Sequence, residues 1–408
     1  MIRRPAAILA LLTGLNFLNY LDRILVAAVL PKISADLGLT KFEGGLLATV
    51  FLLGYFVTSP LFGVMADRGA RKGLIAFGVA VWSLATAASG LATGLATMLL
   101  ARAVVGIGEA SYATLAPTII DDITPPEKKG KALAIFYLAT PLGSALGFVL
   151  GGLIEKQWGW RAVFYVAGGP GLLLAVTCLF IAEPARRLAS SRTSVWASAK
   201  ALLAIPLYRR TVIGYTAHTA ALGAFAHWGP TFLHERYDLD LKSANFWFGA
   251  VTVAAGAIGT IVGGRWVDRA LARHPTTGDH AEAATRRGTN ALLRICAVGV
   301  AFAAPFAVAA FASPSATGFF VLVFFVEIGV FLSTSPVNAA LLRTVPAELR
   351  ASSMAVAIFM IHIFGDLGSP PAVGLLQDHL PIVWAMMALP VLIAAAAVLW
   401  WPRRREAE

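Results

Sequence analysis

Long apolar runs separated by short polar segments make up most of this chain. Each run is about 20 residues long, the length of α-helix needed to cross a bilayer, and none has the strict alternation of a membrane β-strand. Twelve runs are predicted, at residues 6–30, 43–66, 73–93, 97–121, 131–154, 160–182, 211–233, 244–267, 290–311, 317–342, 352–377 and 381–401. The pattern predicts an all-α integral membrane protein with twelve transmembrane helices.

The longest interior polar stretches divide the runs into groups. The stretch 183–210 falls between helices 6 and 7, and the stretch 268–289 follows helix 8. We therefore expect an N-terminal six-helix bundle over 1–183, a cytoplasmic linker over 184–210 and a C-terminal six-helix bundle over 211–408. The role of 268–289 stays open.

Three landmarks recur in matching helices of the two halves. Gly63-Val-Met-Ala-Asp67-Arg68 ends helix 2, and Gly264-Arg-Trp-Val-Asp268-Arg269 ends helix 8. Pro126-Glu127 before helix 5 is echoed by Pro346-Ala-Glu348 before helix 11, and Gly151-Gly-Leu-Ile-Glu155 by Gly374-Leu-Leu-Gln-Asp378. The repeat indicates two pseudo-symmetric bundles, with a substrate site expected at their interface near the bilayer midplane.

Composition supports a membrane setting. Hydrophobic residues make up 58% of the 408 and charged residues 13%, and the mean hydropathy is +0.74, too apolar for a water-covered surface. The net charge of +11 sits in short loops rather than in a patch, so nucleic acid is not an expected partner.

Lysine and arginine also predict the orientation. With the N-terminus inside, 25 of the 33 basic residues fall in inside segments or at the helix ends that adjoin them, and 6 fall outside. By the positive-inside rule both termini are cytoplasmic, in a multi-pass protein of the cell membrane. Asp22 and Arg23 lie in the first apolar run, so we interpret this run as a retained helix rather than a cleaved signal.

Enzymatic motifs are missing from the sequence. It has no HExxH, no GxSxG and no nucleotide-binding loop, so we expect neither an enzyme nor a cofactor or metal site. Cys178 and Cys296 lie inside apolar stretches and are expected to pack.

Two sets of residues carry a family resemblance. Gly63-x-x-x-Asp67-Arg68-Gly-Ala-Arg71-Lys72 resembles the signature loop of the major facilitator superfamily. Within it the chain resembles the Spinster family of lysolipid and sphingolipid transporters. The residues that carry this are Asn19-Tyr20-Leu21-Asp22-Arg23, the helix 4 string Gly106-Ile-Gly-Glu109-Ala-Ser-Tyr112-Ala-Thr-Leu-Ala-Pro117, Pro141-Leu-Gly143-Ser, and His362-Ile-Phe-Gly365-Asp366-Leu-Gly368-Ser-Pro370. The resemblance implies the major facilitator fold and alternating access.

Nine ionisable residues fall at membrane depth, where each costs at least ~2.5 kcal/mol. They are Asp22, Arg23, Arg102, Glu109, His218, His227, Glu327, His362 and Asp366. The resemblance implies that helices 1, 4, 7 and 10 line the cavity, and seven of the nine lie on those helices. A random set of buried ion pairs would not cluster in this way.

Asp22 and Glu109 are the candidates for proton coupling. They lie at similar depth on helices expected to face each other, and two close carboxyls in a low-dielectric site do not both ionise easily. A permanent structural ion pair is the alternative. Candidates for substrate binding are Arg23, Arg102, Asn19, Tyr20, Tyr112, His218 and Glu327. Arg23 points about 100° away from Asp22, which would leave it free for a ligand, although it could instead be a counter-ion.

The remaining candidates concern gating and helix packing. The resemblance implies that Gly63, Asp67, Arg68 and Arg71, with Asp268 and Arg269 in the second half, form a cytoplasmic charge clasp. His362 and Asp366 are four residues apart and can pair in a structural or gating role. Gly106, and the helix 5 series Gly143, Gly147 and Gly151, allow close helix approach.

These features together predict a secondary transporter, acting as a monomer and coupled to protons, for a lysolipid, sphingoid or similar amphiphile. A proton-coupled carrier of a small organic anion or amphipathic drug is the alternative. A lipid carrier needs an apolar groove beside its headgroup site, whereas an anion carrier needs a closed polar pocket.

Overall fold

The computed structural model is helical over nearly all of the residues that it describes, which are 2–68, 71–125, 128–182, 195–273, 281–346 and 349–402. The helices are α1 (Pro5–Leu37), α2 (Lys41–Arg68), α3 (Arg71–Ser89), α4 (Leu95–Ile123), α5 (Lys129–Leu179), α6 (Val195–Ala204), α7 (Pro206–Tyr237), α8 (Leu241–Arg273), α9 (Ala281–Ala312), α10 (Ala316–Leu332), α11 (Thr334–Arg343), α12 (Arg350–Ile361), the π-helical turn His362–Asp366, α13 (Ser369–His379), α14 (Ile382–Met386) and α15 (Ala388–Trp400).

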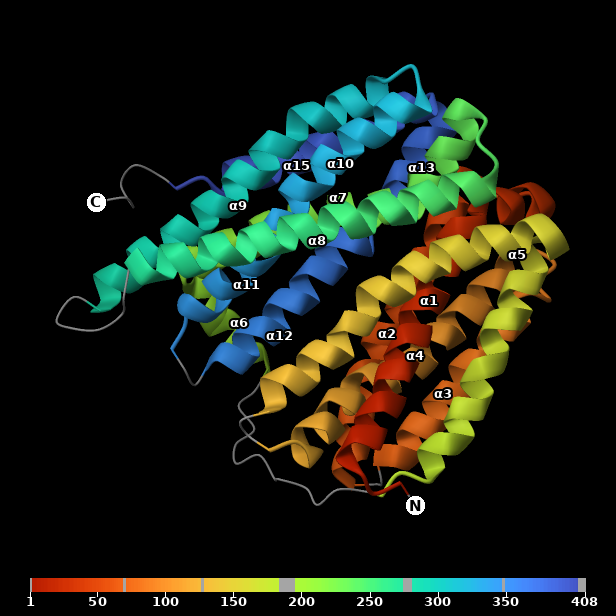
Figure 1. Cartoon of the computed structure of the whole chain (residues 1–408), viewed down its shortest axis with the longest axis horizontal. Coiled ribbons are helices and arrows are strands. Elements are labelled where there is room, and N and C mark those ends of the chain that lie inside the picture. Colours follow the sequence, from red (N-terminus) through yellow and green to blue (C-terminus); the bar gives the residue numbers. More distant parts are fainter. Residues whose placement is uncertain are drawn as a thin grey trace. The chain divides into compact units, whose positions relative to one another are not determined.

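The predicted twelve spans are confirmed. Ten segments of the described chain are long and apolar enough to cross a membrane. One of them, α5, holds predicted helices 5 and 6 in a single helical run that turns back on itself at Gly159, where φ is 79° (Figure 1). Glycine adopts this left-handed conformation without the steric cost of a side chain. The remaining span is α7, which is 32 residues long but less apolar.

Several spans are less regular than their hydropathy indicated. The predicted span 317–342 is broken at Ser333 into α10 and α11. The predicted span 381–401 is broken at Met387 into α14 and α15. The predicted span 352–377 contains the π-helical turn. The first helix, α1, continues seven residues beyond its predicted end, to Leu37. The ten-residue helix α6 lies in the segment predicted as a linker. Mean hydropathy does not distinguish a regular helix from a broken or π-helical one, because an apolar sequence is compatible with all of these geometries.

The chain separates into two compact units. One contains 1–189, 226–249 and 370–378, and the other contains 190–225, 250–369 and 379–408. In the first unit α1 packs on α5, α2 on α4, and α3 on α4 and α5 (Figure 1). In the second, α9 packs on α10, α11 and α15. The division into bundles over 1–183 and 211–408 stays a prediction, because residues 183–194 lie outside the described part.

Apolar and polar side chains are distributed as in a protein surrounded by lipid. Leu173 and Val398 are 74% and 76% exposed, whereas Arg102 and Glu109 are 2% and 0% exposed. A water-soluble protein would expose the charges and bury the aliphatic side chains. The described chain therefore presents its apolar side chains outward and keeps several charged ones inside.

Close helix contacts occur at the glycines that the sequence singled out. A side chain at Gly106 would collide with the carbonyl oxygen of Phe51, so α2 crosses α4 at this residue. Gly143 faces Phe17 and Gly147 faces Leu21, so α5 lies against the backbone of α1. These contacts bring α1, α2 and α4 close enough for their charged side chains to meet.

Candidate functional site

An ion pair joins α1 to α4 inside the first unit. The Nε atom of Arg23 donates to Oε2 of Glu109 across 2.8 Å. Glu109 is fully buried and the side chain of Arg23 is 21% exposed. Arg23 is therefore held by Glu109 rather than left free for a ligand, so a ligand reaching Arg23 would have to share it with Glu109.

Three aromatic rings surround the guanidinium of Arg23. Its Cζ atom lies 5.0 Å from the ring centre of Tyr20, 5.1 Å from Phe51 and 5.1 Å from Tyr55. Such contacts stabilise a cation over the face of a ring and strengthen as water is removed. We call Tyr20, Phe51 and Tyr55 the aromatic box. It fixes the plane of the guanidinium and explains how a partly desolvated arginine is tolerated here.

Asp22 lies on another face of α1 and has different partners. The hydroxyl of Thr86 in α3 donates a hydrogen bond to Oδ2 of Asp22. The positive charge of Arg102 in α4 also acts on Asp22, and Arg102 in turn lies 5.2 Å from the ring centre of Phe51. Phe51 is thus shared by the two arginines. Arg23 pairs with Glu109, and the charges of both arginines act on both carboxyls.

Several buried polar atoms of this group have no hydrogen-bond partner among the described residues. They are Oδ1 of Asp22, Oε1 of Glu109, Nε and Nη1 of Arg102, and Nδ2 of Asn19. Buried polar atoms are nearly always paired, because each unpaired one costs about 1–3 kcal/mol. Unused donors and acceptors therefore gather around the carboxyls of Asp22 and Glu109, as in a site that binds a proton or a polar ligand.

Tyr112 stands apart from this group. It is fully buried between Trp82 and Phe136, and its hydroxyl donates to the carbonyl oxygen of Leu12. The hydroxyl is already used in joining α4 to α1, so the observed contacts are those of a packing residue.

His218 and Glu327 lie in the second unit. The hydroxyl of Thr252 donates to Oε1 of Glu327 at 2.7 Å, and His218 packs beside Tyr215 and Trp400. Both are buried, and both line one apolar cavity. The sequence placed them with Arg23 as substrate ligands, which stays a prediction.

The proposed clasp is described only in part. Arg71 is buried and pairs with Asp122 at 2.7 Å and with Thr118 at 3.1 Å, so its described partners lie in α4. Asp268 and Arg269 are exposed on α8, and a side chain at Gly63 would meet open space. The side chains of Asp67 and Arg68, like Pro126 and Glu127, lie outside the described residues.

His362 and Asp366 make the pair that their spacing allows. Nδ1 of His362 lies 2.9 Å and 3.0 Å from the two carboxylate oxygens of Asp366, across the π-helical turn. Such turns often occur at functional positions of helices. A gating role for this pair stays a prediction.

A cluster at the opposite end of α2 was not anticipated from the sequence. The carboxylate of Asp378 in α13 accepts the backbone N–H groups of Lys41 and Phe42 at 2.8 Å and 2.9 Å, and the Lys41 ammonium pairs with Glu235 of α7. We call Lys41, Phe42, Glu235 and Asp378 the α2 latch. The charge count of the sequence predicts that these residues lie outside the membrane, but their pairing depends on which helix ends meet.

Neighbouring contacts extend the latch. Trp228 donates to the Pro370 carbonyl at 2.8 Å, and Nε2 of His227 lies 3.1 Å from the Gly44 carbonyl. At the start of α8, the backbone N–H and hydroxyl of Ser243 donate to the carboxylate of Asp240 and lower the pKa of its carboxyl. At this end α7 and α13 are joined to α2 by backbone as well as side-chain contacts.

A bundle of membrane-spanning helices with apolar sides and buried, partly paired charges is typical of a transport protein. Comparisons with known proteins agree. Residues 12–369 match the family described as the Major Facilitator Superfamily. Protein spinster homolog 1 of Xenopus laevis is 33% identical over 402 residues, covering 93% of this chain and 74% of that protein. Probable sphingolipid transporter spinster homolog 3 of Arabidopsis thaliana is 30% identical over 455 residues, covering 97% and 84%.

Solved structures show the same fold. A bacterial homolog of the human lysosomal transporter Spinster, in an inward-facing and unoccupied conformation, aligns with a TM-score of 0.84 at 22% identity, over 97% of this chain and 96% of that one. A D-xylose–proton symporter aligns with a TM-score of 0.77 at 15% identity, over 97% and 96%. The chain belongs to the major facilitator superfamily and, within it, to the Spinster family.

Proposed function

We propose that this transporter moves a lysolipid, sphingoid or similar amphiphile and couples the movement to protons through Asp22 and Glu109. The observation that carries the proposal is the Arg23–Glu109 pair beside Asp22 and Arg102. Two acids and two arginines share a water-poor region, and each acid keeps one buried oxygen that has no partner among the described residues.

Proton exchange follows from this arrangement. Burial favours the neutral form of each carboxyl, and an adjacent arginine favours the charged form. A helix movement that weakens the Arg23–Glu109 contact would load Glu109 with a proton, and the return movement would release it. Arg102 would act on Asp22 in the same way, so the two acids respond to the same motion of α1 against α4.

The substrate class is inferred from relatives and from the aromatic box. Two Arabidopsis relatives carry the name probable sphingolipid transporter. Arg23 beside Tyr20 and Tyr55 offers a cation and aromatic faces, which suit a polar headgroup joined to an apolar chain. A small organic anion remains the competing substrate, because the same guanidinium also suits a carboxylate.

Transport into proteoliposomes under an imposed pH gradient tests both the proton coupling and the substrate class. We expect Asp22→Asn and Glu109→Gln each to abolish gradient-driven accumulation while leaving counterflow exchange, which needs no net proton movement. If both variants still accumulate substrate, the carboxyls are structural and the coupling proposal is wrong. A panel of lysolipid, sphingoid base and a short organic anion identifies the substrate class, and exclusive transport of the anion would overturn the lipid assignment.

Topology is the second part of the proposal. With both termini in the cytoplasm, 184–210 is a cytoplasmic linker between two six-helix bundles, and the α2 latch is extracellular. The excess of lysine and arginine on one side supports this orientation. Placement in the cell membrane follows the same inference.

A further inference from the structure

We propose that Glu327 is a second proton-binding site, separate from the Asp22–Glu109 group and coupled to transport. This inference adds to the proposed function, since it assigns part of the proton coupling to the second unit. It rests on the cavity that Glu327 lines, on the single hydrogen bond that holds it and on the charges around it.

Close packing fixes the position of Glu327 on α10. A side chain at Gly259 of α8 would collide with the Ile328 carbonyl, and one at Gly299 of α9 with the Gly329 carbonyl. The backbone of α10 just after Glu327 is therefore in close contact with both α8 and α9. Glu327 has little freedom to reach water by rotating α10.

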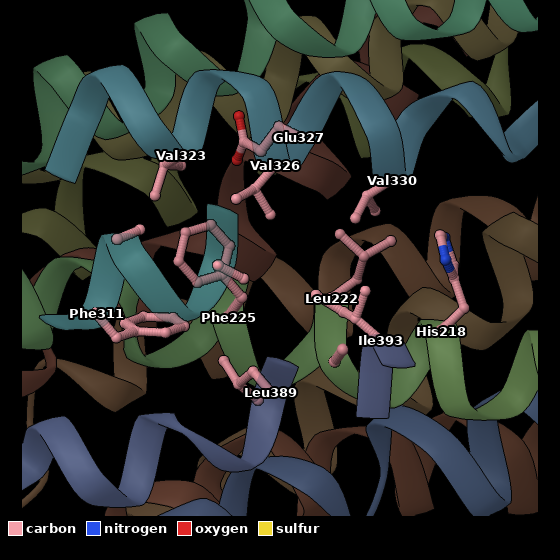
Figure 2. Close-up of a pocket in the computed structure, with 13 residues that line it drawn as sticks. His218, Leu222, Phe225, Phe311, Val323, Val326, Glu327, Val330, Leu389 and Ile393 are labelled. Atoms are coloured by element: carbon pink, nitrogen blue, oxygen red, sulfur yellow. The ribbon is translucent and has the colours of Figure 1, made fainter. Parts of the chain in front are cut away.

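The cavity beside Glu327 is almost entirely apolar. It is small, with a volume of about 30 Å³, and is lined by side chains of α7, α9, α10 and α15. Figure 2 shows Phe225 and Phe311 below Val326, with Glu327 above it and His218 at the far end beyond Val330. Glu327 and His218 are the only ionisable residues among those that line the cavity in the described chain.

The carboxyl of Glu327 is only half satisfied. Thr252 donates to Oε1, while Oε2 is buried without a partner among the described residues, as is Nδ1 of His218. Glu327 is 3% exposed. An ionised carboxylate in such a place would lack the several donors that usually compensate its burial.

Among the described residues, no lysine or arginine forms an ion pair with Glu327. On α8 Lys242 and Arg265 are 10 and 13 residues from Thr252, about 15 and 20 Å along the helix. On α9 Arg294 is 13 residues from Ala307, also about 20 Å along the helix. On α7 Arg210 is eight residues from His218, about 12 Å further from the cavity, and donates to Asn290. Arg343 follows Glu327 by 16 residues, and α15 has no ionisable residue.

These facts distinguish Glu327 from the acids of the first unit. Glu109 has an arginine at 2.8 Å to hold its negative charge, whereas Glu327 has a hydroxyl. The least costly way to bury Glu327 is with a proton on the carboxyl. His218 lies on the wall of the same cavity.

Infrared difference spectroscopy during a pH titration detects the proton directly. We expect a protonated-carboxyl band at neutral pH that is lost in Glu327→Gln and kept in Asp22→Asn, Glu109→Gln and the control Glu155→Gln. Thr252→Val should move the pH at which the band disappears, because it removes a donor that favours the ionised form. A band unchanged in Glu327→Gln would overturn the proposal.

Accumulation at a fixed pH gradient tests the coupling. Each transported proton contributes about a factor of ten per pH unit to the limiting substrate ratio, so Glu327→Gln should lower that ratio about tenfold at a one-unit gradient with the membrane potential clamped. Loss of the band with an unchanged accumulation ratio would mean that the proton on Glu327 is not exchanged during transport, and would also overturn the proposal. If Glu327→Gln does not fold, the infrared and accumulation measurements are made on Thr252→Val instead. The Asp22 and Glu109 variants show separately whether the proposed function fails.

Discussion

The carboxylate of Asp378 caps the first turn of α2 by accepting the backbone N–H of Lys41 at 2.8 Å, although the two residues are 337 positions apart. Helix N-termini leave their first N–H groups unpaired, and a carboxylate there also interacts favourably with the helix dipole. The cap usually comes from a residue just before the helix. Thr40 does accept the N–H of Glu43 at 3.2 Å, but the N–H groups of Lys41 and Phe42 are accepted by Asp378 of α13. The first turn of α2 is therefore fully paired only while α13 is docked on it.

Removing this cap should loosen the docked arrangement. We expect Asp378→Ala to cost about 1 kcal/mol, the usual effect of losing a helix cap. A cysteine placed at Phe42 should then react faster with an impermeant reagent added outside. Glu155→Ala is the matched control, because Glu155 ends the repeated motif in the first half and makes no hydrogen bond or ion pair among the described residues. Equal labelling rates in both variants would show that Asp378 does not hold the contact.

Arg23 should not be replaceable by lysine. Arg23→Lys keeps the positive charge facing Glu109 but loses the flat guanidinium that contacts Tyr20, Phe51 and Tyr55. Loss of these contacts is worth about 1–2 kcal/mol, so we expect at least about a tenfold drop in initial transport rate. Tyr55→Phe, which keeps the ring, should change the rate little. A fully active Arg23→Lys would show that charge alone is needed.

Gly106 should tolerate no side chain. Gly106→Ala places a methyl group against the Phe51 carbonyl, and separating α2 from α4 should cost about 1–3 kcal/mol. Gly14→Ala in α1 is the opposite control, since a side chain there meets nothing within 4 Å and alanine stabilises a helix by up to about 1 kcal/mol. Thermal unfolding in detergent measures both, and the prediction fails if Gly106→Ala melts at or above the parent temperature.

The proposed topology has a simple check. A single cysteine placed between 185 and 205 should be protected from an impermeant thiol reagent in intact cells and become reactive after permeabilisation. One placed at Lys41 should react in intact cells. Labelling of 185–205 from outside would reverse the orientation, and with it the assignment of the α2 latch to the extracellular side.

The sequence alone was enough for the fold class and the family. Span lengths, hydropathy and the repeated Gly–Asp–Arg motif are local properties, and a bilayer leaves a polypeptide few options besides helices of about 20 residues. The same reasoning identified Asp22, Arg23, Arg102 and Glu109, because an ionisable residue inside an apolar run is costly enough to stand out.

Only the tertiary structure decided which groups meet. Successive residues on a helix point about 100° apart, so a small rotation of α1 determines whether Arg23 faces Glu109 or open space. The Arg71–Asp122 pair and the Asp378 cap likewise depend on which helix ends are neighbours. Hydropathy places residues along the membrane normal. It carries little information about rotation around a helix axis or about contacts between distant helices. That rotation and those contacts decide the chemistry of the buried charges.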